Sequence, residues 1–169
     1  PADNALLLLS AQSEAALSGQ TNRFQQFIAD QPDQLADICY TAVHHRTRFP
    51  SRSWSLYQNG QLTSQRNLTA DKPAKIALLF TGQGAQLPGM ATNLYQNQPV
   101  FRETVDRCLQ LTGPLPLLED DPAVHRTEHT QPCLFVFEYA LYSLWRHWGL
   151  EPVAVLGHSI GELVAATVA

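Results

Sequence analysis

The residues best suited to chemistry form a pentapeptide near the C-terminal end of the sequence, Gly157-His158-Ser159-Ile160-Gly161. The apolar run Pro152–Leu156 before it predicts a buried strand, and residues 160–166 after it predict a helix. A serine between glycines at a sharp strand-to-helix turn is typical of a nucleophile elbow. Such a turn crowds the serine backbone, and the helix N-terminus offers free N–H groups to a developing oxyanion. We therefore interpret Ser159 as the nucleophile of an acyl-transfer reaction.

A serine at this place has a simpler interpretation, as the N-cap of the helix that follows. A cap needs only the side-chain oxygen and an extended backbone, and it does not need a glycine on each side. The two flanking glycines, together with the strand before and the helix after, favour the nucleophile over the cap.

A second loop with two glycines, Gly82-Gln83-Gly84, follows the apolar run Lys75–Phe80. A dinucleotide fingerprint would need a third glycine opening a helix, but leucine and proline follow here, and there is no Gly-Lys-Ser/Thr. Nucleotide binding is therefore disfavoured. In elbow enzymes one oxyanion N–H comes from the residue after the nucleophile and another from an earlier strand-end loop. We predict that Ile160 supplies the first and Gln83 the second.

The first part of the chain, residues 1–72, predicts a small unit of strands and helices. Its expected elements are a strand at Ala5–Leu9, a helix capped by Ser13, a helix over Gln34–Ala42, a strand at Ser53–Tyr57 and an Asn59-Gly60 hairpin turn. The polar stretch Asn67–Pro73 predicts a linker. No chemistry is evident in this unit, since adjacent histidines His44 and His45 do not share a helix face.

The second part, residues 73–169, alternates strand and helix, which predicts an α/β fold with a parallel, helix-covered sheet. Its expected elements are a strand at Lys75–Phe80 covered on both faces, a helix over Val100–Leu111, a helix capped by Thr130 and ended by Gly149, and a strand at Val153–Leu156. The helix after Thr130 carries apolar residues nearly all round, so we expect it to be deeply buried.

The composition indicates which kinds of protein and partner are compatible with this sequence. The 169 residues are 44% hydrophobic and 15% charged with a net charge of -4, so a globular core is possible, and neither nucleic acid nor a membrane is an expected partner. Three cysteines without metal-like spacing predict free thiols and no metal site, as expected for a cytoplasmic protein. The chain begins without Met and stops inside the predicted helix after Ser159, so we expect it to be part of a longer polypeptide.

Three separate motifs occur in an order and spacing that resemble the acyltransferase domain of type I modular polyketide synthases. They are Phe80-Thr81-Gly82-Gln83-Gly84-Ala85-Gln86, Thr130-Gln131-Pro132-Cys133-Leu134-Phe135 and Gly157-His158-Ser159-Ile160-Gly161-Glu162. The malonyl-CoA:ACP transacylases of fatty-acid synthesis are similar to the same region. Residues 1–72 resemble the linker domain between ketosynthase and acyltransferase in these synthases. Residues 73–169 would then be the N-terminal part of an α/β-hydrolase-like acyltransferase domain.

The resemblance implies a ping-pong transfer in which Ser159 takes an acyl group from coenzyme A. The group then passes to the phosphopantetheine thiol of an acyl carrier protein, and the chain itself binds no cofactor. Gln83 and Ile160 match the oxyanion-hole positions, while Gln131 and His158 match residues that line the substrate site. An aliphatic residue at position 160 favours malonyl over methylmalonyl. A ketosynthase domain in the same polypeptide and a homodimeric parent are also implied.

The family's catalytic histidine and its carboxylate-binding arginine lie further along the polypeptide than Ala169, so we expect this chain alone to be inactive and prone to aggregate. The remaining histidines match no base position and are interpreted as surface or helix-end residues, namely His44, His45, His125, His129 and His147. Two alternatives stay open: a serine esterase of the α/β-hydrolase type, and a non-catalytic docking remnant beside a ketosynthase.

Overall fold

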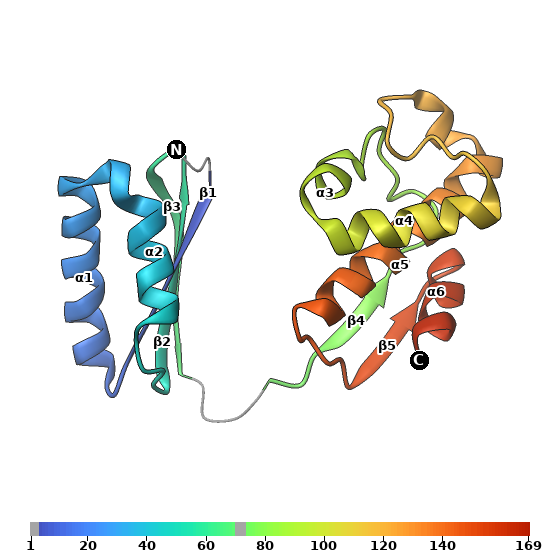
Figure 1. The fold of residues 1–169 in the computed structure, drawn as a ribbon. Helices are drawn as coiled ribbons and strands as arrows, with labels where there is room; N and C mark the ends of the chain where they lie inside the picture. The colour runs from blue at the N-terminus through green and yellow to red at the C-terminus, as the bar shows by residue number, and fades with distance from the viewer. Residues whose placement is uncertain (1–3, 70–73) are drawn as a thin grey trace. The chain divides into compact units, whose positions relative to one another are not determined.

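The computed structural model describes residues 4–69 and 74–169, and the chain divides into two compact units at Pro73/Ala74 (Figure 1). The first unit contains the strands β1 (Asn4–Ala11), β2 (Ser51–Gln58) and β3 (Gln61–Thr69), the helices α1 (Glu14–Asp30) and α2 (Leu35–His44), and a 3-10 turn at Pro32–Gln34.

The strands of the first unit form an antiparallel sheet in the order β1-β2-β3, and both helices pack on one of its faces (Figure 1). Alternate residues of β1 and β2 point into the core, where Leu7, Leu9 and Tyr57 meet apolar side chains of the helices. Ser13 caps α1 as predicted, since its hydroxyl accepts a hydrogen bond of 3.2 Å from the Ala16 N–H.

The β2–β3 hairpin turns through two residues with positive φ, Asn59 at 50° and Gly60 at 78°. Both values suit the two-residue turn that matches strand twist, which confirms the predicted hairpin. The linker prediction is wrong at its start, because Asn67–Thr69 belong to β3 and pair with β2. Polar residues can form a strand here because β3 lies at the edge of the sheet and every one of its residues is exposed to solvent. The rest of that stretch, 70–73, lies outside the described residues.

The second unit is an α/β arrangement, in agreement with the predicted fold class. Its elements are β4 (Ala77–Phe80), α3 (Thr92–Asn97), α4 (Pro99–Thr112), a 3-10 turn at Pro122–His125, α5 (Thr127–His147), β5 (Ala154–Gly157) and α6 (Ile160–Val168). Strands β4 and β5 are parallel neighbours, so the connection between them crosses over through the helices (Figure 1).

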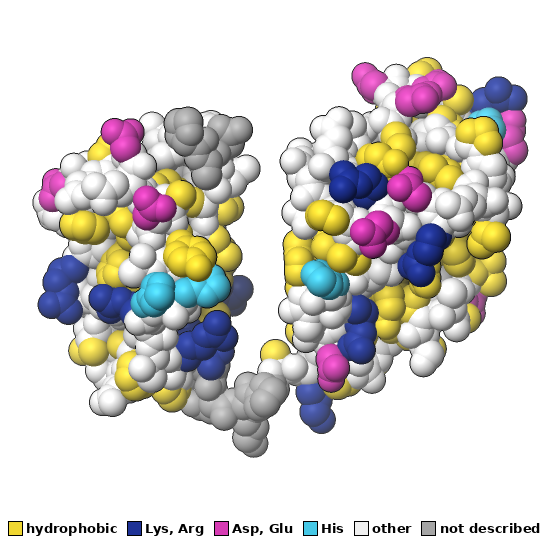
Figure 2. Space-filling view, viewed as in Figure 1, with side chains coloured by type: hydrophobic (Ala, Val, Ile, Leu, Met, Phe, Trp, Pro, Cys, Tyr) yellow, Lys and Arg dark blue, Asp and Glu magenta, His cyan; other side chains and the backbone are white. Residues whose placement is uncertain are grey.

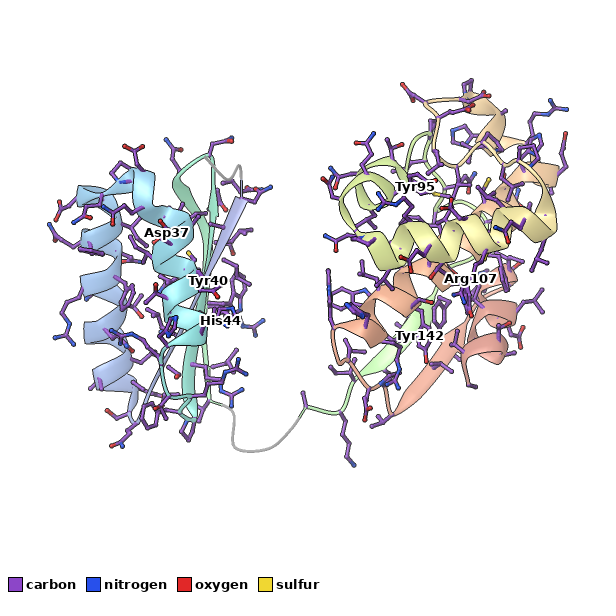
Figure 3. The ribbon with its side chains drawn as sticks, in the orientation of Figure 1. Asp37, Tyr40, His44, Tyr95, Arg107 and Tyr142 are labelled. Atoms are coloured by element: carbon purple, nitrogen blue, oxygen red, sulfur yellow. The ribbon has the colours of Figure 1, made fainter. Side chains whose placement is uncertain are left out.

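Two apolar clusters hold this unit together. In the larger one Phe101 and Val105 of α4 meet Val136 and Leu144 of α5. In the smaller one Phe80 packs with Val164 and Ala165 of α6, so the strands rest against α5 and α6. The hydroxyl of Tyr142, labelled in Figure 3, reaches from α5 to the last turn of α6 and donates to the Val168 carbonyl at 3.4 Å. The two helices that cover the strands are therefore also joined to each other.

The predicted start of α5 is wrong. The helix begins at Thr127, and Thr130 lies inside it, fully buried, with its hydroxyl 2.7 Å from the Val124 carbonyl and 3.0 Å from the Arg126 carbonyl. These bonds tie the first turn of the helix to the preceding 3-10 turn. The hydroxyl therefore satisfies carbonyl groups, and does not cap N–H groups.

Burial in this unit is less complete than the sequence predicts. Trp145 and Trp148 near the end of α5 are exposed, so the helix is not buried all round. Among the described residues, α5 and α6 cover one face of the strands, while Leu79 and Leu156 on the other face remain 72% and 66% exposed. Gly149, with a φ of 85°, follows the end of α5 as predicted.

Histidines outside the pentapeptide lie mostly at the surface. His44 and His45 of the first unit are both exposed, and Figure 2 shows histidine side chains at the surface of this unit. His125 and His147 are exposed as well, and His129 is half-buried. None of them is hydrogen-bonded to Ser159 within the described residues. The surface interpretation therefore agrees with their burial.

Candidate active site

The parallel pairing of β4 and β5 brings two loops to one edge of the sheet. Phe80 is paired with Gly157, so the chain leaves both strands at the same level. The His158 N–H donates to the Phe80 carbonyl at 3.1 Å and extends the contact by one residue beyond the strands. Loops after the carboxyl ends of parallel strands are where open α/β sheets bind ligands. The loop of Gln83 and the loop of Ser159 therefore emerge side by side.

The glycines of the pentapeptide permit this close approach. A Cβ atom on Gly161 would lie 2.5 Å from the carbonyl oxygens of both Phe80 and Thr81. A Cβ on Gly157 would overlap the Gly161 carbonyl group. Atoms that close cannot coexist, so each position needs a residue without a side chain. The glycines thus pack the start of α6 directly against the end of β4.

Ser159 has a backbone conformation that few residues adopt, with φ 54° and ψ -120°. Among residues 4–69 and 74–169, Asn59 is the other non-glycine residue with positive φ, and it lies in a hairpin turn. Such strain costs about 1–3 kcal/mol and persists only where the surroundings impose it. Ser159 occupies the N-cap position of α6, yet its side chain makes no capping hydrogen bond, and the residue is exposed. The hydroxyl is presented to solvent and has no role as a helix cap.

Two backbone N–H groups at this edge of the sheet make no hydrogen bond within the described residues. The N–H groups of Gly161 and Glu162 donate to the carbonyls of His158 and Ser159, each at 3.0 Å. The Ile160 N–H and the Gln83 N–H donate to no atom in the described part of the chain. Unpaired amides at a helix N-terminus and in an adjacent glycine loop are suited to holding an oxygen that gains negative charge.

The predicted substrate-site residues surround this edge. His158 is exposed, and its ring lies beside Gly82, where an added Cβ would stand 2.5 Å from Nδ1. The Gln83 side-chain amide donates to the Thr127 hydroxyl at 3.3 Å, which places the loop against the first turn of α5. Gln131 is exposed one helical turn after Thr127, on the same side of α5. The fold therefore assembles Gln83, His158 and Ser159 with Ile160 and places Gln131 on the neighbouring helix.

Comparison with known proteins decides the family. Residues 77–169, more than half of the chain, match the family model described as the acyl transferase domain. The chain belongs to the acyltransferase family of polyketide synthases. Residues 5–65 match a second model, described as CurL-like, PKS C-terminal, which covers most of the first unit.

The chain is similar to parts of much longer proteins. It is 36% identical to the PKS-NRPS hybrid synthetase ATPKS of Aspergillus niger over 96% of this chain and 10% of that protein. The solved acyl transferase domain of ZmaA is 30% identical, with a TM-score of 0.84, over 99% of this chain and 44% of that one. A malonyl-CoA:ACP transacylase of Synechocystis is 35% identical, with a TM-score of 0.53, over 57% of this chain and 33% of that one. The chain thus spans less than half the length of each.

Two cysteine thiols of the chain are poorly suited to act as nucleophiles. Cys133 is fully buried in α5, and burial raises the pKa of its thiol from 9.0 to about 11. Burial also raises the pKa of Cys39 in α2. A thiol is nucleophilic only when ionised, so both remain inert near neutral pH. Within the described ranges, no cluster of ligating side chains could hold a metal ion, and no helix has the length and apolarity needed to cross a bilayer.

Glu138 of α5 also lies near this site, although no motif in the sequence includes it. Its carboxyl oxygen Oε1 accepts hydrogen bonds from the N–H and the hydroxyl of Thr81, the first residue after β4. The signal available in the sequence was a single charged residue inside the apolar stretch Cys133–Trp145. Such a residue is rarely buried without a specific partner.

Proposed function

We propose that the polypeptide to which this chain belongs transfers an acyl group from coenzyme A to an acyl carrier protein through an ester on Ser159. In the first step the Ser159 oxygen attacks the thioester carbonyl, loses its proton to a base and displaces the coenzyme A thiolate. The base then gives this proton to the departing coenzyme A sulfur. In the second step the base takes the proton of the phosphopantetheine thiol, the sulfur attacks the ester carbonyl, and the released serine oxygen receives that proton from the base. Family resemblance assigns the base to a histidine further along the polypeptide, and no side chain among the described residues is hydrogen-bonded to the Ser159 hydroxyl.

The conformation of Ser159 is the observation that carries this proposal. The hydroxyl is exposed on a strained turn and makes no capping bond, while two unpaired amides lie at the same edge of the sheet. A tetrahedral intermediate places a negative oxygen next to the nucleophile, and each such donor is worth about 100- to 1,000-fold in rate. A structural serine would use its hydroxyl to cap the helix, and it would not need the strain.

The acyl group is proposed to be malonyl. Ile160 is aliphatic, and the family resemblance associates an aliphatic residue at this position with selectivity for malonyl. The similar Synechocystis protein is described as a malonyl-CoA:ACP transacylase. The carrier protein and a ketosynthase domain of the same synthase are the proposed partners, supported by the polyketide synthase match over residues 5–65.

The test uses the intact polypeptide, holo carrier protein and either malonyl-CoA or methylmalonyl-CoA. We expect malonyl transfer to the carrier thiol, preference for malonyl in competition, and loss of transfer in Ser159→Ala. Ser64→Ala, which changes an exposed serine of β3, is the matched control and should retain full activity. Release of free acid without carrier acylation would instead support the esterase, and absence of any acyl-enzyme would support the docking remnant.

A further inference from the structure

Glu138 is a buried acid in an apolar setting. It lies in the middle of α5, is only 8% exposed, and is the one charged residue between Cys133 and Trp145. Burying a carboxyl group is costly unless hydrogen bonds replace its water. The bonds it makes therefore indicate what keeps it in the interior.

Those bonds go to one residue. Glu138 Oε1 lies 2.7 Å from the Thr81 N and 2.6 Å from the Thr81 hydroxyl oxygen, and both groups donate to it. The other carboxyl oxygen, Oε2, is buried and has no partner in the described part of the chain. Fold stability alone would favour an apolar side chain here, because half of the carboxyl group remains unsatisfied.

Thr81 is held from the opposite side by the nucleophile loop. Its carbonyl oxygen, like that of Phe80, faces the Cα of Gly161, and the Phe80 carbonyl accepts from the His158 N–H. Thr81, the first residue after β4, is thus held by α5 through its N–H and hydroxyl, while its carbonyl packs against α6. Gln83, with its unpaired N–H, follows two residues later.

We propose that Glu138 is a positioning residue for the oxyanion donor on Gln83. By fixing Thr81, the carboxyl group sets the direction in which the loop leaves the strand and so aims the Gln83 N–H at the site beside Ser159. This role rests on the acyl transfer proposed above, and Glu138 itself touches neither substrate nor the reacting atoms.

The test compares variants of the intact polypeptide. Glu138→Leu removes both bonds to Thr81, whereas Glu138→Gln keeps an amide oxygen that can accept them. We expect single-turnover acylation of Ser159 at saturating acyl-CoA to fall about 10- to 100-fold in the leucine variant, because a misplaced donor loses most of its effect. The glutamine variant should recover most of the rate. The acyl-CoA concentration for half-maximal rate should barely change, since ground-state binding is not altered.

Two further variants separate positioning from stability. Val136→Ala opens a cavity on the same helix in the core shared with α4, away from Thr81, and should lower the melting temperature without slowing acylation. Thr81→Val removes one of the two bonds from the exposed loop, so it gives a result even if Glu138→Leu does not fold. We expect this variant to show a smaller loss of rate than the leucine variant.

A second measurement does not depend on catalysis. Amide hydrogen exchange in the peptide spanning residues 78–86 should accelerate in Glu138→Leu, and it should stay near wild type in Glu138→Gln and Val136→Ala. If the wild-type protein forms no acyl-enzyme, the proposed function fails, but the exchange measurement still tests whether Glu138 holds Thr81 in place. Unchanged exchange and unchanged acylation in Glu138→Leu would overturn the inference, as would an equal loss of rate in Val136→Ala.

Discussion

Replacing Gly161 by alanine tests the contact that brings the two loops together. The added Cβ would lie 2.5 Å from the carbonyl oxygens of Phe80 and Thr81, whereas ordinary contacts begin at 3.4 Å. The start of α6 must therefore move away from the end of β4 by about 0.9 Å, a displacement that can cost about 100-fold in rate when donors and nucleophile separate. The same overpacking should lower the free energy of unfolding by about 1–3 kcal/mol.

The assay follows the rate of Ser159 acylation by malonyl-CoA in samples quenched at successive times. The melting temperature is recorded on the same protein preparations. Gly19→Ala is the matched control, because Gly19 lies in α1 and a Cβ there meets nothing within 4 Å. We expect the control to keep full activity and to be slightly more stable, since alanine favours helix. A folded Gly161→Ala protein with wild-type acylation would refute the close-approach argument.

Three further predictions concern the rest of the fold. Gly60→Ala forces alanine to a φ of 78° and should cost about 1 kcal/mol in chemical denaturation of the first unit, whereas the same change at Gly19 should not. Thr130→Val removes the buried hydroxyl that joins α5 to the Val124 carbonyl, and should cost about 1–3 kcal/mol by the same method. The raised pKa of Cys133 means that folding favours its protonated form, so its contribution to stability is complete below pH 9.0 and declines as pH rises through about 11. Thiol labelling of Cys133 should stay slow at pH 8 until the protein unfolds, and fast labelling of the folded protein would contradict its burial.

Local signals in the sequence predicted most of the elements. The Ser13 cap, the Asn59-Gly60 turn and Gly149 each act through their own backbone or nearest neighbours, so the structure agrees with them. The prediction that Thr130 caps α5 was wrong because its hydroxyl bonds to carbonyl groups before the helix, which spacing alone does not reveal. The prediction of a linker at residues 67–69 was wrong because pairing with β2 makes them part of a strand despite their polar composition.

In the candidate site, too, the features set by neighbouring residues were predictable, and those that depend on distant contacts were not. The position of Ser159 at a strand-to-helix turn was predictable because the glycine spacing, the strand and the helix are all adjacent in sequence. Its free hydroxyl was not, since a cap and a nucleophile differ in side-chain direction, which the sequence does not contain. The partnership of Glu138 with Thr81 spans 57 residues and depends on how α5 crosses β4. Only the fold reveals such a pair.

Mapping the acylated residue tests the central claim most directly. The intact polypeptide is mixed briefly with malonyl-CoA, without carrier protein, and digested for mass spectrometry. We predict one malonyl group on the peptide that contains Ser159, and its loss when holo carrier protein is added before digestion. A malonyl group carried by any other residue, or a Ser159 peptide that stays unmodified while the carrier becomes acylated, would contradict the account.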